Sequence, residues 1–187
     1  FSNDKAMINS FLNDEDIHAS TASSVYGVNL NEVTRVQRSN AKTINFGIMY
    51  GVSAFGLSQQ TDLSRTESKE LIEKYYFTYN ELNNYIKNQI DKARELGFVE
   101  TILGRRRYLR NILSQNAVVR SSDERNAINA PIQGSAADII KIAMINIFEE
   151  LEKRQLRSKM ILQVHDELVF EALNDETEEL SLSLIHI

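Results

Sequence analysis

A regular spacing of four residues constrains the fold of this chain more than any other feature of its sequence. The residues that recur in QRSNAKTINFGIMYG are Arg38, Lys42, Phe46 and Tyr50. Because an α-helix turns about 100° per residue, the pattern predicts a helix on which these side chains follow one slowly drifting face. Such a face suits a nucleoside triphosphate, since cations can meet phosphate oxygens while flat rings cover a sugar and stack beside a base. Alone, the pattern is more typical of an ordinary solvated helix face.

A second signal lies far downstream, where polar residues interrupt an apolar run. The segment KMILQVHDELVFEA breaks at His165, Asp166 and Glu167 and then resumes, which predicts a β-hairpin with acidic side chains at its tip. Carboxylate oxygens at that tip could hold Mg²⁺. The chain has no cysteine, which excludes disulfides and thiolate metal sites and fits a reducing cytoplasm.

Composition limits the kinds of partner. With 187 residues, 42% of them hydrophobic, the chain can bury a core in one domain or two small lobes. A net charge of -5 argues against coating nucleic acid through bulk positive charge, so such binding must use local patches. Residues 35–51 contain no acid, and residues 104–110 pack four arginines around one tyrosine. No apolar stretch reaches the roughly 18 residues that span a bilayer, so we expect no membrane partner.

Boundary signals along the chain predict an α+β fold with a small antiparallel sheet. Capping residues and glycines indicate two helices between 64 and 97, and others at about 17–26, 31–49, 123–129 and 135–154. Apolar and polar residues alternate over 98–103 in a pattern that predicts a strand. Pro131, the only proline, should end or kink the helix before it.

Two motifs resemble those of a known family. RSNAKTINFGIMYG, over 38–51, resembles the nucleotide-binding helix of family A DNA polymerases, the bacterial DNA polymerase I type, and VHDE, over 164–167, resembles the carboxylate hairpin of that family. The resemblance continues through the segments DIHASTA, GRR and ERNAINAPIQG at 16–22, 104–106 and 124–134. It covers essentially everything except the C-terminal tail.

That resemblance implies a fragment of the right-hand polymerase fold. Residues 1–110 would form most of the helical fingers, and residues 111–181 the C-terminal part of the palm with its small antiparallel sheet. Residues 182–187 fit neither part, and the DNA that would encode them resembles a sequencing-library adapter, so we expect a non-native tail. Since the first residue is Phe1, we also expect that the chain is a piece of a longer protein.

The resemblance also implies roles for individual residues. Those expected to bind the incoming dNTP are His18, Arg38, Lys42, Phe46 and Tyr50. Those expected to touch primer-template DNA near its growing end are Arg125, Asn129, Gln133 and His165. Asp166 would bind the catalytic Mg²⁺ ions and Glu167 would support it, and Lys42 would neutralise charge near the α-phosphate.

One carboxylate is missing from this set. Two-metal phosphoryl transfer holds its ions about 3.5–4 Å apart and needs more than one carboxylate. Asp166 is the one good candidate, because the family's second aspartate lies in a strand reading DYSxIELR and no such segment occurs here. We therefore expect the parent protein to be a monomeric, cytoplasmic DNA-directed DNA polymerase of replication or repair, and the 187-residue chain alone to be inactive.

Two alternatives stay open at this point. A non-catalytic module that binds a nucleotide or primer-template DNA would carry the same cations and aromatic rings. A single-subunit RNA polymerase would share the spaced arginine, lysine and tyrosine, but Phe46 and Gly47 speak against it, since those enzymes resemble Met-Thr at these places.

Overall fold

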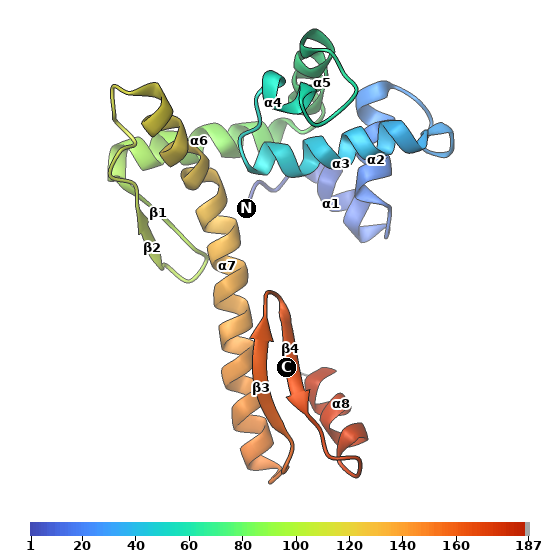
Figure 1. Ribbon diagram of the computed structural model, residues 1–187, viewed down its shortest axis with the longest axis vertical. Coiled ribbons are helices and arrows are strands. Elements are labelled where there is room, and N and C mark those ends of the chain that lie inside the picture. The colour runs from blue at the N-terminus through green and yellow to red at the C-terminus, as the bar shows by residue number, and fades with distance from the viewer. Residues whose placement is uncertain (186–187) are drawn as a thin grey trace. The chain divides into compact units, whose positions relative to one another are not determined.

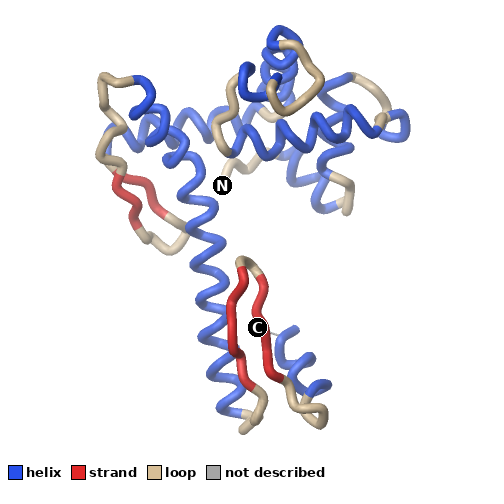
Figure 2. The backbone as a smooth tube through the Cα atoms, in the orientation of Figure 1, coloured by secondary structure: helices blue, strands red, loops and turns tan. Residues whose placement is uncertain are grey.

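The computed structural model describes residues 1–185 and divides into two compact units (Figures 1 and 2). Unit 1 contains residues 1–100 and 106–132, and unit 2 contains residues 101–105 and those from 133 onward. Helices dominate, and each of two small sheets consists of one antiparallel strand pair. The predicted α+β class is therefore confirmed. The division into fingers and palm at residue 110 stays a prediction.

Unit 1 is built from helices around one main core. Its elements are α1 (Lys5–Leu12), α2 (Ile17–Tyr26), the short 3₁₀ helix η1 (Leu30–Glu32), α3 (Arg35–Met49), α4 (Ala54–Ser58), α5 (Arg65–Thr78), α6 (Asn80–Leu96), β1 (Phe98–Glu100), β2 (Arg106–Tyr108) and the first part of α7 (Ala117–Lys153). Ile44 and Ile48 of α3 pack in this core with Leu57, Tyr75 and Tyr79. Each such side chain contributes about 1.5–3 kcal/mol by leaving water, so α3 is held firmly by its inner face.

Local capping explains most helix boundaries. Asp16 caps α2 by accepting from the backbone N–H groups of His18 and Ala19 at 2.9 and 3.1 Å. Ser64 and Glu67 form a capping box at the start of α5, and Gly97, at φ +76°, ends α6. These boundaries confirm the predictions from the sequence.

Two predicted boundaries were wrong. The helix expected over 31–49 starts only at Arg35, because Thr34 caps it and the separate turn η1 precedes it. Pro131 neither ends nor interrupts α7, which runs unbroken from Ala117 to Lys153. A proline inside a helix removes one hydrogen bond and costs about 3 kcal/mol. Here the proline ring is fully buried and Ala127, Ile128 and Ser135 are buried as well, so packing outweighs that loss.

Unit 2 carries the predicted hairpin. Strands β3 (Lys159–Val164) and β4 (Glu167–Glu171) pair antiparallel, with Gln163 opposite Leu168 and an irregularity between Met160 and Leu162. The hairpin packs with the end of α7 and with α8 (Thr177–Ile185) around Ile147, Leu151 and Leu180.

The expected tail overlaps the last helix. Residues 182–185 belong to α8, while residues 186 and 187 lie outside the described residues. The non-native origin of this tail stays a prediction. Over the described part of the chain, every helix is too short or too polar to cross a membrane.

Candidate functional site

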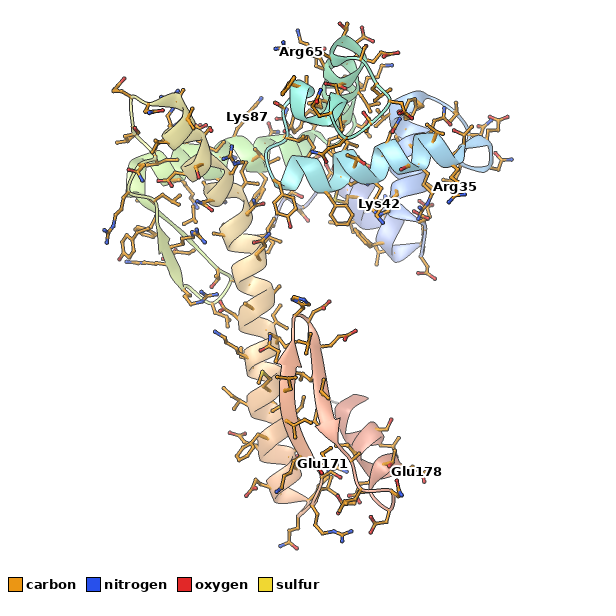
Figure 3. All side chains as sticks on the ribbon, in the orientation of Figure 1. Arg35, Lys42, Arg65, Lys87, Glu171 and Glu178 are labelled. Carbon is orange, nitrogen blue, oxygen red and sulfur yellow. The ribbon has the colours of Figure 1, made fainter. Side chains whose placement is uncertain are left out.

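The predicted face of α3 points to solvent. Arg38, Lys42, Phe46 and Tyr50 are all exposed, whereas Ile44, on the opposite side, is fully buried. The aromatic rings keep 53% (Phe46) and 54% (Tyr50) of their surface exposed. Figure 3 labels Lys42 on this helix. We call these four exposed residues the α3 stripe.

Helix α2 brings His18 and Asp16 to the α3 stripe. The ring centroids of His18 and Phe46 lie 5.7 Å apart. Asp16 accepts from Arg38 Nε at 2.7 Å, and Nη2 of Arg38 lies 2.6 Å from the same carboxylate oxygen. Partial burial alone would raise the pKa of Asp16, but hydrogen bonds from Arg38, Ala19 and His18 outweigh it and lower the pKa overall. Asp16 is therefore a stable counter-ion for Arg38.

The surroundings of His18 lower its pKa and so favour the neutral ring. Partial burial lowers its pKa most, Asp16 raises it, and the nearby cations Arg38 and Lys42 lower it again, so the net direction is downward. A neutral imidazole has one N–H donor and one acceptor nitrogen. The direction in which it can donate therefore depends on its tautomer.

A groove of about 520 Å³ follows the second half of the α3 stripe. Lys42, Phe46 and Tyr50 line it, together with Arg125 from α7. Gly51 has φ +65°, and a Cβ built on it would lie only 2.8 Å from Cγ of Arg125. The absence of a side chain at 51 thus lets Arg125 lie across the end of α3. The structure brings one predicted DNA-binding residue to the predicted nucleotide-binding residues within unit 1.

The other predicted DNA-binding residues lie along α7 and at the hairpin. Asn129 belongs to unit 1 and Gln133, which is exposed, to unit 2. Both lie on the one continuous helix, so Pro131 does not separate them. The Oδ1 atom of Asn129 is buried and has no hydrogen-bond partner among residues 1–185. Such an acceptor is costly to leave unpaired, so it is a candidate for a contact made only in a complex.

The hairpin tip places His165, Asp166 and Glu167 together in solvent. His165 adopts the left-handed conformation, with φ +55°, and its carbonyl oxygen accepts from Nε2 of Gln163 at 2.8 Å. The tip was predicted correctly. Over residues 1–185, however, no group of three or more His, Asp or Glu side chains is arranged to hold a metal ion.

Several charged residues singled out by the sequence have structural partners. Nε of Arg105 donates to Asp138 at 2.8 Å within unit 2. Arg106 donates to Glu100 at 2.8 Å and lies over the Phe98 ring, with Cζ 4.4 Å from its centroid. These contacts give Arg105 and Arg106 partners within the fold, so both arginines have a structural role.

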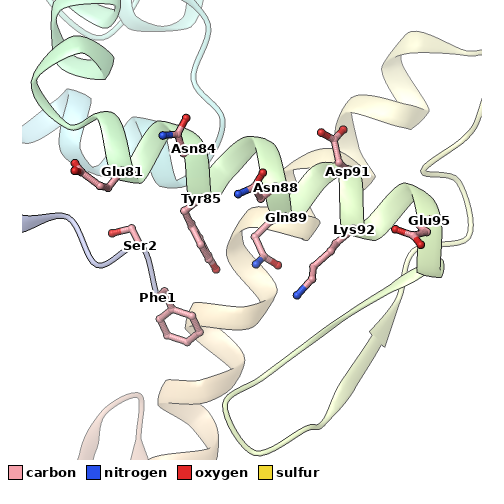
Figure 4. A pocket seen from close by; sticks show the side chains of 10 residues that line it. All are labelled: Phe1, Ser2, Glu81, Asn84, Tyr85, Asn88, Gln89, Asp91, Lys92 and Glu95. Carbon is pink, nitrogen blue, oxygen red and sulfur yellow. The ribbon is translucent and has the colours of Figure 1, made fainter.

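A larger groove, of about 590 Å³, runs along α6 (Figure 4). Its charged lining residues are Glu81, Asp91, Lys92 and Glu95. An acidic excess repels phosphate, so this groove does not suit the ligand that the α3 stripe suits. The site predicted from the sequence is the better candidate.

Comparison with known proteins shows the family of this chain. The family model for DNA polymerase family A matches residues 1–186, and the chain belongs to that family. DNA polymerase I of Caldicellulosiruptor bescii is 47% identical over 177 residues, which are 95% of this chain and 21% of that protein. DNA polymerase I of Bacillus subtilis is 45% identical and matches 95% of this chain and 20% of its own length.

A solved structure is also similar. The POL domain of Pol1 from M. smegmatis, in complex with DNA primer-template and dNTP, superposes with a TM-score of 0.90 at 44% identity. The match covers 98% of this chain and 32% of that one. The chain therefore spans about a fifth of the length of the two DNA polymerase I relatives and about a third of this polymerase domain.

Proposed function

We propose that the protein to which this sequence belongs is a DNA-directed DNA polymerase, and that this chain carries its dNTP-binding surface. The α3 stripe is the observation that supports this most strongly. Two cations and two half-exposed aromatic rings follow one face of a helix whose other face is anchored in the core. Relatives named DNA polymerase I, and a similar domain in complex with DNA primer-template and dNTP, support the same activity. The family argues against the RNA polymerase alternative.

In this proposal each part of the α3 stripe meets one part of the nucleotide. Arg38, Lys42 and His18 bind the triphosphate, Phe46 lies against the sugar and Tyr50 borders the base. Charge neutralisation around the phosphates is most of what phosphoryl transfer requires of a protein. Within unit 1, the groove beside Lys42, Phe46 and Tyr50 has room for such a ligand.

Primer-template DNA is the proposed second partner. Arg125 lies beside the α3 stripe, and Asn129 follows it one turn further along α7. Gln133 and His165, both exposed, are the proposed DNA contacts of unit 2. The NH₂ groups of asparagine and glutamine can donate to the minor-groove acceptors shared by all correct base pairs, which tests shape without selecting sequence.

For Mg²⁺ we propose only that this chain supplies part of the ligands. Asp166, with Glu167 beside it, would supply carboxylate oxygen to the ions that this chemistry uses, and further ligands are required. We therefore propose that the 187-residue chain binds dNTP without extending a primer. Primer extension by the purified chain in the presence of Mg²⁺ would refute this point. The monomeric state and the cytoplasmic location stay predictions.

Binding of a dNTP to the purified chain tests the proposal directly. Isothermal titration calorimetry would compare the dNTP affinity of the unsubstituted 187-residue chain with that of its Arg38→Ala and Lys42→Ala variants. Each loss of a charged contact should weaken binding by about tenfold or more, since a hydrogen bond to a charged group contributes about 1.5–3 kcal/mol. Lys87→Ala is the matched control, because Lys87 is an exposed lysine on α6. If Lys42→Ala and Lys87→Ala weaken dNTP binding equally, the binding is general charge attraction and the proposed site is wrong.

A further inference from the structure

Arg35 is an exposed cation to which the sequence motifs and the α3 stripe give no role. It is the first residue of α3, directly after the cap Thr34, and Figure 3 labels it together with Lys42 on this helix. Over residues 1–185, no acidic side chain forms an ion pair with its guanidinium, whereas Arg38 is held by Asp16. Arg35 can therefore bind an anion without giving up a partner.

The position of Arg35 around the helix axis matches that of the groove. Phe46 follows Arg35 by eleven positions, which at 100° per residue places the two within about 20° of each other around the axis. Arg38 lies about 80° away from Phe46. Among the described residues, those that line the groove include Ser39, one turn after Arg35, but not Arg38. The wall of the groove that Lys42 and Ser39 form therefore continues, one turn further, to Arg35.

The direction of the ligand gives Arg35 the outermost place along this wall. In the proposed function Tyr50 borders the base, Phe46 lies against the sugar and Lys42 binds phosphate, so further phosphates extend toward the start of α3. The Cα atom of Arg35 lies about 10.5 Å further along the helix axis than that of Lys42, at 1.5 Å per residue. Two long cationic side chains with this separation can hold the two ends of a triphosphate, whereas a monophosphate reaches only Lys42.

The charge along this wall of the groove is not balanced within the free chain. Residues 35–51 contain no acid. Within the described part of the chain, Asp16 is the single acid that forms an ion pair with α3, and it holds Arg38. Arg35 and Lys42 therefore keep their positive charges at two points along one wall. A ligand that carries several negative charges along its length would compensate both, which a ligand with one compact anionic group would not.

We propose that Arg35 is a further phosphate-contact residue, which binds the terminal phosphate of the dNTP while Lys42 binds the phosphate nearest the sugar. This inference rests on the proposed function, because the direction of the ligand comes from the roles of Phe46 and Tyr50. It adds a property that the α3 stripe alone does not have, namely selectivity for a triphosphate over shorter nucleotides.

Nucleotides that differ in their number of phosphates test where Arg35 makes its contact. Calorimetric titrations with dNTP, dNDP and dNMP would compare the unsubstituted 187-residue chain with its Arg35→Ala and Lys42→Ala variants. Arg35→Ala should weaken dNTP binding about fivefold and leave the binding of dNDP and dNMP unchanged, since only the triphosphate reaches position 35. Lys42→Ala should weaken the binding of all three nucleotides.

Arg65→Ala is the matched control. Arg65 is also exposed and is also the first residue of a capped helix of unit 1, and Figure 3 labels it on α5. The control removes the same charge from the same kind of helix position and should leave the affinity for all three nucleotides unchanged. If Arg35→Ala binds dNTP as tightly as Arg65→Ala does, or weakens dNTP and dNMP binding equally, Arg35 does not contact the terminal phosphate and the inference fails.

Two further readings separate the possible causes of a loss of binding. Arg35 is exposed and outside any ion pair of the described residues, so Arg35→Ala should not lower the free energy of unfolding in urea. A variant that loses stability along with dNTP affinity would overturn the direct contact. Failure of the unsubstituted chain to bind dNTP would overturn the proposed function and this inference together. Binding that Lys42→Ala weakens and Arg35→Ala does not would overturn the inference alone.

Discussion

Removing the negative charge of Asp16 should strengthen dNTP binding, although Asp16 lies within the proposed site. Its carboxylate holds Arg38 through contacts of 2.7 and 2.6 Å, so Arg38 has to give up this partner when it binds phosphate. The two side chains keep 45% and 43% of their surface exposed, and such exposed pairs contribute about 0.2–1 kcal/mol. Releasing Arg38 through Asp16→Asn should therefore raise dNTP affinity by about 1.4-fold to fivefold.

The substitution is suited to a clean comparison, because asparagine caps a helix as well as aspartate does. The backbone N–H groups of His18 and Ala19 keep an acceptor, so the free energy of unfolding should change little. Calorimetric titration at low and high salt should show a gain that shrinks as salt screens the charges. Asp62→Asn controls for net charge, since Asp62 is an exposed aspartate of unit 1. Unchanged or weaker binding by a folded Asp16→Asn variant would refute the competition between Asp16 and phosphate for Arg38.

Three further predictions concern stability and are tested by urea unfolding. Tyr79→Phe should lower the free energy of unfolding by about 1 kcal/mol, because it removes the buried hydrogen bond to Thr21. Tyr85→Phe should leave it unchanged, since the buried Tyr85 hydroxyl has no hydrogen-bond partner among residues 1–185. Equal losses in the two variants would contradict the bond between Tyr79 and Thr21. Gly51→Ala should lower the free energy of unfolding by about 1–3 kcal/mol, because position 51 has a positive φ and Cγ of Arg125 lies close to the added Cβ. An unchanged free energy of unfolding would contradict this close packing. Hydrogen bonds from the Ser158 side chain and the Arg157 backbone lower the pKa of Glu176 from 4.5 to about 2. The contribution of the Glu176 carboxylate to the free energy of unfolding is therefore complete above about pH 4.5 and is lost as the pH falls toward 2. Glu176→Gln should remove this pH dependence of stability.

The helix boundaries that could be predicted are those determined within one turn of the chain. Ser64 with Glu67, and Gly97, act on their own helix ends, so their identity was enough. The start of α3 was missed because two capping boxes follow each other closely, at Asn29–Glu32 and Thr34–Gln37, and only the second one begins the long helix. The continuity of α7 through Pro131 accompanies the full burial of the ring, and the residues of one turn do not determine burial.

The same distinction applies to the site. The α3 stripe is periodic and was therefore visible in the sequence, as was the interruption that forms the hairpin tip. Asp16 and Asn45 were not recognised as parts of the site, because their partners Arg38 and His18 lie 22 and 27 positions away. Asp16 is also a good helix cap, and that local role explained it fully until the structure placed Arg38 beside it.

The three functions of α3 limit which of its residues can change independently. Ile44 anchors the helix in the core, Asn45 contacts His18, and Phe46 is half exposed beside the groove, all within three consecutive positions. Successive helical side chains point about 100° apart, so one turn can face the core, the neighbouring helix and solvent at once. A shift of the helix about its axis would move all three together. The buried isoleucines therefore act on the ligand face as well, since the packing that stabilises the fold also determines which way Lys42 and Phe46 point.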